Sequence, residues 1–203
     1  MPGSGLTQSS PSTAFTILQA HVDTSHVSRI RSMASMLTFD ERPDSVDGRP
    51  AHELYILRDG AVVNSADLHT LMQPSLVRLT REVNDRRAIC KATLAGCKPC
   101  TSLIRRYRPG ERRTHSEHID GHAAVTAVVS LSHATDFSGG FFVSNLSSRA
   151  LVPLERGDAV IHASDLFHGV DVRSGERWSW VVWCIGAGRK LESLLRCTST
   201  LVV

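Results

Sequence analysis

Residues 118 to 122 read His-Ile-Asp-Gly-His and place two histidines and an aspartate within five positions. Zinc proteases of the HExxH kind separate two histidines in the same way on one face of a helix, with a glutamate in second place as general base. Ile119 occupies that place here, Gly121 disfavours a helix, and the β-branched run that follows favours a strand. The segment therefore predicts a strand rather than a zinc helix.

Residues two apart on a strand share a face, so we expect His118 and Asp120 to point at one site. A His-x-Asp pair with one distant histidine is the facial triad that binds non-haem iron(II) and leaves coordination positions open. His168 is the candidate for that histidine. Arg177 opens the apolar run after it and is expected on the inner face of a strand, where burial without a carboxylate partner is costly. A dicarboxylate co-substrate is one such partner.

The second half of the chain resembles the 2-oxoglutarate and iron(II)-dependent dioxygenase superfamily, and most of all its prolyl 4-hydroxylase-like branch. Each matching fragment is weak alone, but together they follow the family order, and His-x-Asp with a later His-(eight residues)-Arg is specific. The fragments are Tyr107-x-x-Gly110, His118-x-Asp120, Phe137-x-Gly139-Gly140, Gly157-Asp158, His168-x-Val170, Gly175-x-Arg177 and Trp183.

The resemblance implies a double-stranded β-helix (jelly-roll) core with helices outside one sheet. It also implies a hydroxylase that uses Fe(II), 2-oxoglutarate and O2 and releases succinate and CO2. The expected target is an unactivated C–H bond of a prolyl residue in a peptide or protein, of a free amino acid or of a small metabolite. The resemblance does not distinguish among these substrates, and modified nucleobases are also substrates of the same core.

The resemblance also assigns roles to individual residues. His118, Asp120 and His168 are the implied iron ligands and catalytic centre, and Arg177 is implied to hold the distal carboxylate of 2-oxoglutarate. Two further positions, Tyr107 and Thr126, match residues that contact the co-substrate or line its pocket in relatives. In one departure from the pattern, Ser130 stands where many relatives have a tyrosine. His115 and His162 crowd the motif and are interpreted as loop or supporting histidines rather than ligands.

Two other classes of protein remain as alternatives. One is a non-enzymatic metal-binding jelly-roll module or sensor whose barrel has lost turnover. The other is a cupin-like metalloenzyme that does not use 2-oxoglutarate, and such an enzyme has no use for Arg177. The intact metal and co-substrate motifs favour the dioxygenase over both.

Hydrophobic periodicity predicts the elements that position these residues. Apolar side chains recur every three or four residues over 27–37 and 68–83, which predicts two helices, the second kinked or restarted at Pro74. Residues 52–57 read as a short strand ended by a turn at Asp59-Gly60. Seven short apolar runs follow residue 101 and predict a β-sandwich or barrel, so the fold class is α+β and mainly β, with N-terminal helices packed on one sheet.

Length and composition set the remaining expectations. The 203 residues, 41% hydrophobic and 21% charged, predict a single dioxygenase domain over 14–203 after a flexible tail at 1–13. No stretch reaches the length of a membrane span and no secretory signal is visible, which predicts a soluble cytoplasmic protein. A net charge of +3 is too small to indicate a nucleic-acid partner, although five arginines crowd residues 105–113. The oligomeric state does not follow from the sequence.

Five cysteines, an odd number, argue against a disulfide framework. Cys97 and Cys100 form a lone CxxC that follows Cys90, and a redox pair or zinc site there is the alternative to plain reduced thiols. Because no second CxxC and no thioredoxin-like strand–helix context accompany it, we expect reduced thiols.

Overall fold

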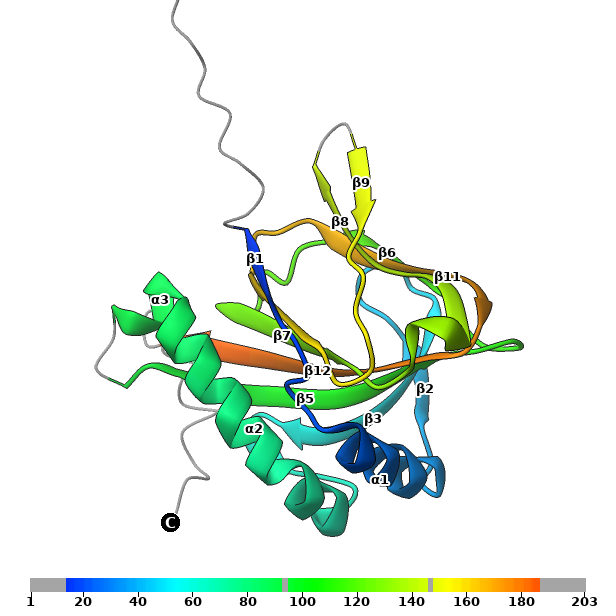
Figure 1. Cartoon of the computed structure of the whole chain (residues 1–203), viewed down its shortest axis with the longest axis horizontal. Helices are drawn as coiled ribbons and strands as arrows, with labels where there is room; N and C mark the ends of the chain where they lie inside the picture. The colour runs from blue at the N-terminus through cyan, green and yellow to red at the C-terminus, as the bar shows by residue number, and fades with distance from the viewer. Residues whose placement is uncertain (1–13, 93–94, 146–147, 187–203) are drawn as a thin grey trace, which may run out of the picture.

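Two antiparallel β-sheets face each other in the computed structural model, which describes residues 14–92, 95–145 and 148–186 (Figure 1). The major sheet runs β1 (Phe15–Leu18), β10 (Ala159–Ala163), β7 (Val125–Ser130), β12 (Arg177–Gly186), β5 (Cys97–Tyr107), β3 (Pro50–Arg58) and β2 (Asp40–Pro43), with β4 (Ala61–Val62) paired to β3. The minor sheet runs β6 (Thr114–His118), β11 (His168–Gly175), β8 (Phe137–Asn145) and β9 (Ser148–Leu151). A 3-10 turn, η2 (Ala134–Asp136), leads into β8.

The core between the two sheets is apolar and comes from the alternating inner positions of their strands. Major-sheet residues Leu103, Val128 and Val181 meet minor-sheet residues Phe141 and Val170 there, and all five are buried. All seven strands predicted after residue 101 are present, so the predicted mainly β class is confirmed. The sequence did not reveal β1 and β2, which are short strands at the edges of the major sheet.

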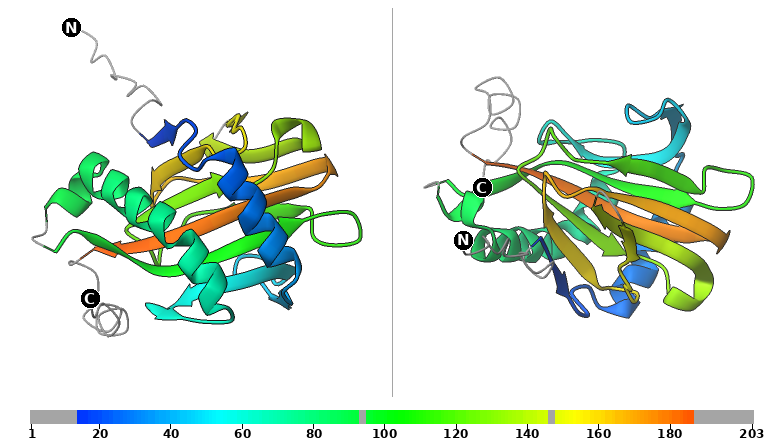
Figure 2. Two further views of the ribbon diagram at one scale, coloured as in Figure 1. Left: turned by 60° about the horizontal axis from the view of Figure 1, so that its bottom comes forward. Right: turned by 90° about the horizontal axis from the view of Figure 1, so that it is seen from above.

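The helices α1 (Thr24–Ser35) and α2 (Ala66–Arg86) cover the outer face of the major sheet, and the short α3 (Ala88–Lys91) follows them (Figure 2). Asp23 caps α1, because its carboxylate accepts the backbone N–H groups of Ser25 and His26. The predicted helical faces are confirmed, but α2 runs through Pro74 as one helix. Its packed apolar face, which includes Leu68, Leu79 and Val83, outweighs the cost of the proline.

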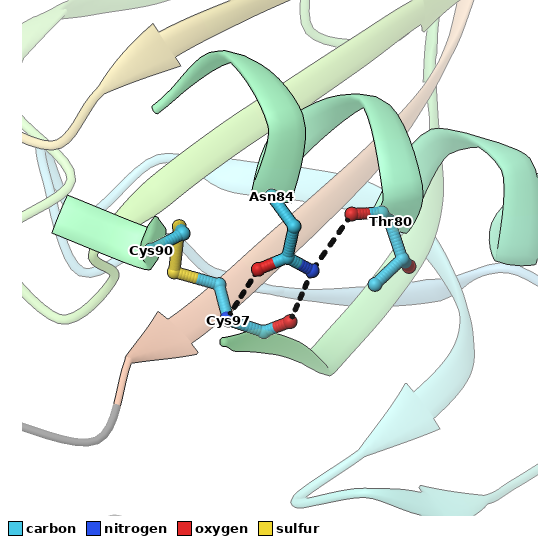
Figure 3. The surroundings of a disulfide bond; sticks show 4 residues. All are labelled: Thr80, Asn84, Cys90 and Cys97. Atoms are coloured by element: carbon cyan, nitrogen blue, oxygen red, sulfur yellow. Dashed lines mark hydrogen bonds between the residues drawn. A yellow bond between two sulfur atoms is a disulfide. The ribbon is translucent and has the colours of Figure 1, made fainter. Parts of the chain in front are cut away.

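The prediction of reduced thiols is wrong, because a disulfide joins Cys90 to Cys97 (Figure 3). Cys97 and Cys100 cannot pair with each other, since three residues of extended β5 separate their Cα atoms by about 10 Å, beyond disulfide reach. The bond ties α3 to the start of β5, and Cys184 stays a buried free thiol. Disulfides are typical of oxidising compartments, which counts against the predicted cytoplasmic location.

Asn84 of α2 holds the start of β5 beside this disulfide (Figure 3). Its side-chain oxygen accepts the Cys97 backbone N–H at 2.7 Å. Its amide nitrogen donates to the carbonyls of Cys97 at 3.1 Å and Thr80 at 2.9 Å. One side chain thus fixes the end of a covering helix to the strand that enters the barrel.

Neither long helix of the described chain has the apolar length needed to cross a membrane. The predicted tail at 1–13 and the C-terminal part of the predicted 14–203 domain lie outside the described residues, so these boundaries stay predictions. Most of the arginines at 105–113 face carboxylates: Arg105 pairs with Glu53 and Asp44, Arg106 and Arg108 with Glu111, and Arg112 with Asp47. Such paired charges leave little of this cluster for a phosphate backbone.

Candidate metal and co-substrate site

The three predicted metal ligands converge at one end of the barrel. His118 ends β6 and His168 begins β11, and the two lie opposite each other in the antiparallel register. Asp120 lies between their rings, with one carboxylate oxygen 3.5 Å from Nε2 of His118 and the other 3.5 Å from Nε2 of His168. One donor atom from each residue falls within 4.8 Å of the other two, which no other group of His, Cys, Asp or Glu among the described residues achieves.

Asp120 reaches this site differently from the way the sequence suggested. The strand ends at His118, so Asp120 lies in the turn that follows rather than on the same strand face, and that part of the prediction is wrong. Its backbone N–H donates to the carbonyl of Ser164, next to β10, and its carbonyl accepts the N–H of Ala123. The turn therefore brings the carboxylate inward without strand alternation.

Gly169 lets the two histidine-bearing strands approach. A Cβ atom at this position would lie 2.7 Å from the carbonyl oxygen of His115 and 2.5 Å from the Phe142 ring. Any larger residue would push β11 away from β6 and separate His168 from His118. The glycine after the distant histidine is thus required by close packing.

Hydrogen bonds fix both imidazoles in the form that a metal needs. Nδ1 of His118 lies 2.7 Å from the carbonyl oxygen of Ser116, and Nδ1 of His168 lies 2.9 Å from that of Leu166. A carbonyl only accepts, so each Nδ1 carries the proton and each Nε2 presents a lone pair toward Asp120. This is the arrangement by which proteins orient metal-binding histidines. Burial, with the charge of neighbouring His118, also lowers the pKa of His168.

The carboxylate of Asp120 is held ionised and in place. Thr126 of β7 donates its hydroxyl to Asp120 Oδ2 at 2.6 Å, and both residues are buried. Burial alone would raise the pKa of Asp120, but the adjacent imidazoles of His118 and His168, whenever they are protonated, and the Thr126 hydroxyl hold it well below its usual range. Two imidazoles and one carboxylate are a donor set that fits iron(II) and other first-row divalent ions. Thr126 thus supports the carboxylate of a predicted metal ligand, and its predicted contact with the co-substrate stays a prediction.

Arg177 is the first residue of β12 and is only 1% exposed. Among the described residues neither Nη1 nor Nη2 has a hydrogen-bond partner, and the Cζ atom lies 5.9 Å from the ring centres of Tyr107 and Phe137. Burial lowers the pKa of this guanidinium, because the charged form has lost its water. An unpaired buried guanidinium is costly, so the site fits an incoming anion.

A cavity of about 370 Å³ lies beside Arg177. Arg177, Gly140 and Phe141 line it, and the Phe141 ring lies 5.6 Å from the ring of His168. We name this space the inner cavity. Apart from Arg177 its lining is mostly apolar, and the triad residues do not form part of it.

Three other histidines lie near the triad but do not belong to the group of donor atoms that could hold a metal. His162 of β10 is fully buried and its ring lies 4.4 Å from that of His168, while His115 of β6 lies 4.3 Å from His118. His122 packs edge-on against Trp183. Ser130, the departure from the family pattern, donates its hydroxyl to the carbonyl of Ser132.

A second cavity of about 500 Å³ opens over His118 and Asp120, and we name it the outer chamber. Its wall contains an ionic network that the sequence did not reveal. Arg105 Nε donates to Glu53 at 2.9 Å, and its Nη atoms contact Asp44 at 3.2 Å and His115 Nδ1 at 2.7 Å. Strand alternation over 52–57 places Glu53 and Tyr55 on one face, and this pattern is the feature of the sequence that could have indicated part of the network.

Comparisons with known proteins support the fold. No protein-family model and no curated protein sequence matches the chain. Among solved structures, a 2OG-Fe(II) oxygenase family oxidoreductase from Burkholderia pseudomallei is similar with a TM-score of 0.66, 22% identity and 85% of each chain covered. A prolyl-4-hydroxylase from Pseudomonas putida has a TM-score of 0.62 and 15% identity over 86% of this chain and 94% of its own.

A third similar structure is a prolyl hydroxylase from Trichoplax adhaerens, solved with a peptide fragment of the hypoxia inducible factor oxygen degradation domain. It has a TM-score of 0.64 and 13% identity, and the alignment covers 86% of this chain and 84% of that one. The two sheets therefore form the jelly roll of the 2OG-Fe(II) oxygenases, and the predicted fold and family resemblance are confirmed at that level.

Proposed function

We propose that this protein is an Fe(II)- and 2-oxoglutarate-dependent dioxygenase that hydroxylates an unactivated C–H bond. The single observation that carries the proposal is Arg177, which lies in the same barrel as a His-Asp-His triad. Its buried guanidinium has no hydrogen-bond partner at either Nη atom among the residues that the structure describes. A metal-binding module or a cupin-like enzyme without 2-oxoglutarate has no need of a buried cation at this position. A dicarboxylate co-substrate does need one.

Each residue has a defined task in this proposal. His118, Asp120 and His168 would hold iron(II), and Arg177 would bind the distal carboxylate of 2-oxoglutarate through paired N–H donors. Tyr107, whose ring centre lies 5.9 Å from Arg177 Cζ, would lie beside the bound carboxylate. The bound iron and 2-oxoglutarate, with O2, would supply the oxidising chemistry, with succinate and CO2 as by-products. The protein side chains orient these groups and exclude water from the cavity.

The outer chamber is the proposed substrate site, because it lies over His118 and Asp120 and opens to solvent. A prolyl residue in a peptide is the first candidate, since two of the similar structures are named as prolyl hydroxylases and one holds a peptide. A free amino acid or small metabolite fits the same chamber by size.

The test is succinate release from 2-oxoglutarate in the presence of iron(II) and ascorbate, measured against prolyl peptides and free amino acids. We expect 2-oxoglutarate consumption by the wild type that a substrate stimulates and that Asp120→Ala abolishes. Arg173→Met, which changes an exposed arginine on β11, is the matched control for general effects of removing an arginine. Succinate formation no greater than in a protein-free control for every substrate would refute the proposal.

A further inference from the structure

The charged groups that line the outer chamber differ in whether they are already bonded. Glu53 accepts from Arg105 and from the Tyr55 hydroxyl, which donates at 2.9 Å. Asp44 accepts the Val46 backbone N–H at 2.8 Å as well as Arg105. These chamber carboxylates are therefore bonded before any ligand arrives, and they offer little to a cationic substrate.

Two arginines at the rim of the same chamber form only longer ion pairs. The guanidinium of Arg42 lies near Asp40 on β2, with its Nη2 atom 3.7 Å from Asp40 Oδ2. Nη2 of Arg58 lies 3.9 Å from the same oxygen. Both separations exceed hydrogen-bond length, so two guanidinium groups share one carboxylate at ion-pair distance. This pair leaves one net positive charge at the rim.

Arg58 is also held in position. Its Cζ lies 4.0 Å above the ring centre of Tyr55, and the Tyr55 hydroxyl is bonded to Glu53, which Arg105 holds. A cation stacked on a fixed ring loses less rotamer freedom on binding than a free arginine does. The positive rim thus rests on the buried network of the chamber wall.

A further donor belongs to the wall of the same chamber. Trp183 lines the outer chamber, and its buried indole N–H has no hydrogen-bond partner in the described part of the chain. Indole nitrogen can only donate. Arg42, Arg58 and Trp183 can only donate hydrogen bonds, so these three groups favour a ligand with acceptor groups.

From this placement we propose that the outer chamber takes a substrate bearing a carboxylate or phosphate, and that Arg42 and Arg58 bind this anionic group at the rim. The proposal rests on the proposed function for the position of the target carbon, which would lie over His118 and Asp120. It narrows the substrate class to acidic small molecules or peptides whose anionic group lies close to the oxidised carbon.

The experiment measures calorimetric binding of matched probes to the Co(II)-loaded protein. N-acetyl-L-proline and N-acetyl-L-prolinamide differ only at the carboxylate, and phenyl phosphate with phenol provides the phosphate arm. We expect the anionic member of at least one pair to bind about tenfold more tightly, as charge-assisted contacts to two arginines allow. The double variant Arg42→Gln/Arg58→Gln should reduce this preference to about twofold or less, with neutral probes unaffected.

The control variant Arg29→Gln removes an exposed arginine from α1, away from the chamber, and should keep the preference. The proposal is wrong if neither pair shows an anion preference, or if the preference persists in the double variant. A parallel titration of the iron(II) protein with 2-oxoglutarate separates the two claims. A wild type that binds 2-oxoglutarate but lacks the preference overturns only the substrate class, whereas the preference without 2-oxoglutarate binding overturns only the proposed function.

Discussion

The Thr126→Val variant tests whether the residues around the triad prepare it for a metal. The substitution keeps the branched shape but removes the hydroxyl that donates to Asp120 Oδ2 at 2.6 Å. Both side chains are buried, so water cannot replace the lost donor, and a hydrogen bond to a charged group contributes about 1.5 to 3 kcal/mol. The carboxylate then loses one of the contacts that set its rotation and its charge.

We expect divalent metal affinity to fall about 10- to 100-fold, which is the usual cost of losing a supporting contact to a ligand. The assay is Co(II) titration in competition with a chelating dye at a pH near 7.5. Ser130→Ala is the matched control, because Ser130 is a buried hydroxyl on the same strand that bonds the Ser132 carbonyl and not the triad. Equal affinity in Thr126→Val and wild type, or an equal loss in Ser130→Ala, would refute the reasoning.

Three further predictions concern stability. Replacing both Cys90 and Cys97 by serine should lower the free energy of unfolding by about 2 to 3 kcal/mol in urea, whereas indifference to reductant would show that these thiols do not pair. Asn84→Ala should cost about 2 to 4 kcal/mol, because it removes three hydrogen bonds at the start of β5, and a loss below about 1 kcal/mol would contradict the arrangement. Burial lowers the pKa of His162 to about 3, so the metal-free protein should lose stability as the pH falls from about 6.5 toward 3, by up to about 1.4 kcal/mol per pH unit. The unfolded chain binds a proton in this window and the folded one does not, and a His162→Gln variant should show a smaller slope in urea unfolding measured across that range.

Local spacing in the sequence was enough to predict that His118, Asp120 and His168 lie together and that Arg177 is buried, because each lies at or next to the end of a strand. Their roles in binding a metal and 2-oxoglutarate stay predictions. Strand alternation was the wrong reason for Asp120, since the strand stops at His118 and a turn anchored to Ser164 places the carboxylate. The spacing taken from the family resemblance identified residues that do lie together, although Asp120 lies in a turn and not on a strand. Motif order was thus a better guide here than the assumed secondary structure.

Contacts between distant segments account for what the sequence did not predict. Arg105 is joined to Glu53 and Asp44 across 52 and 61 positions, so neither pair has a local signature. The β2 strand is polar and lies at a sheet edge, where apolar alternation is not required. The pairing of Cys90 depended on α3 returning to the start of β5, which cysteine spacing alone does not specify.

Anaerobic titration of the iron(II) protein with 2-oxoglutarate, followed by its weak visible charge-transfer band, tests the central claim most directly. Wild type should develop the band, and Arg177→Met should need about 30- to 1,000-fold more 2-oxoglutarate, because losing the buried carboxylate contact costs about 2 to 4 kcal/mol. Iron binding should be unchanged in the variant, since Arg177 does not contact the triad residues, and Arg173→Met should titrate like wild type. No band in wild type, or equal affinity in wild type and Arg177→Met, would contradict the assignment of this barrel as a 2-oxoglutarate site.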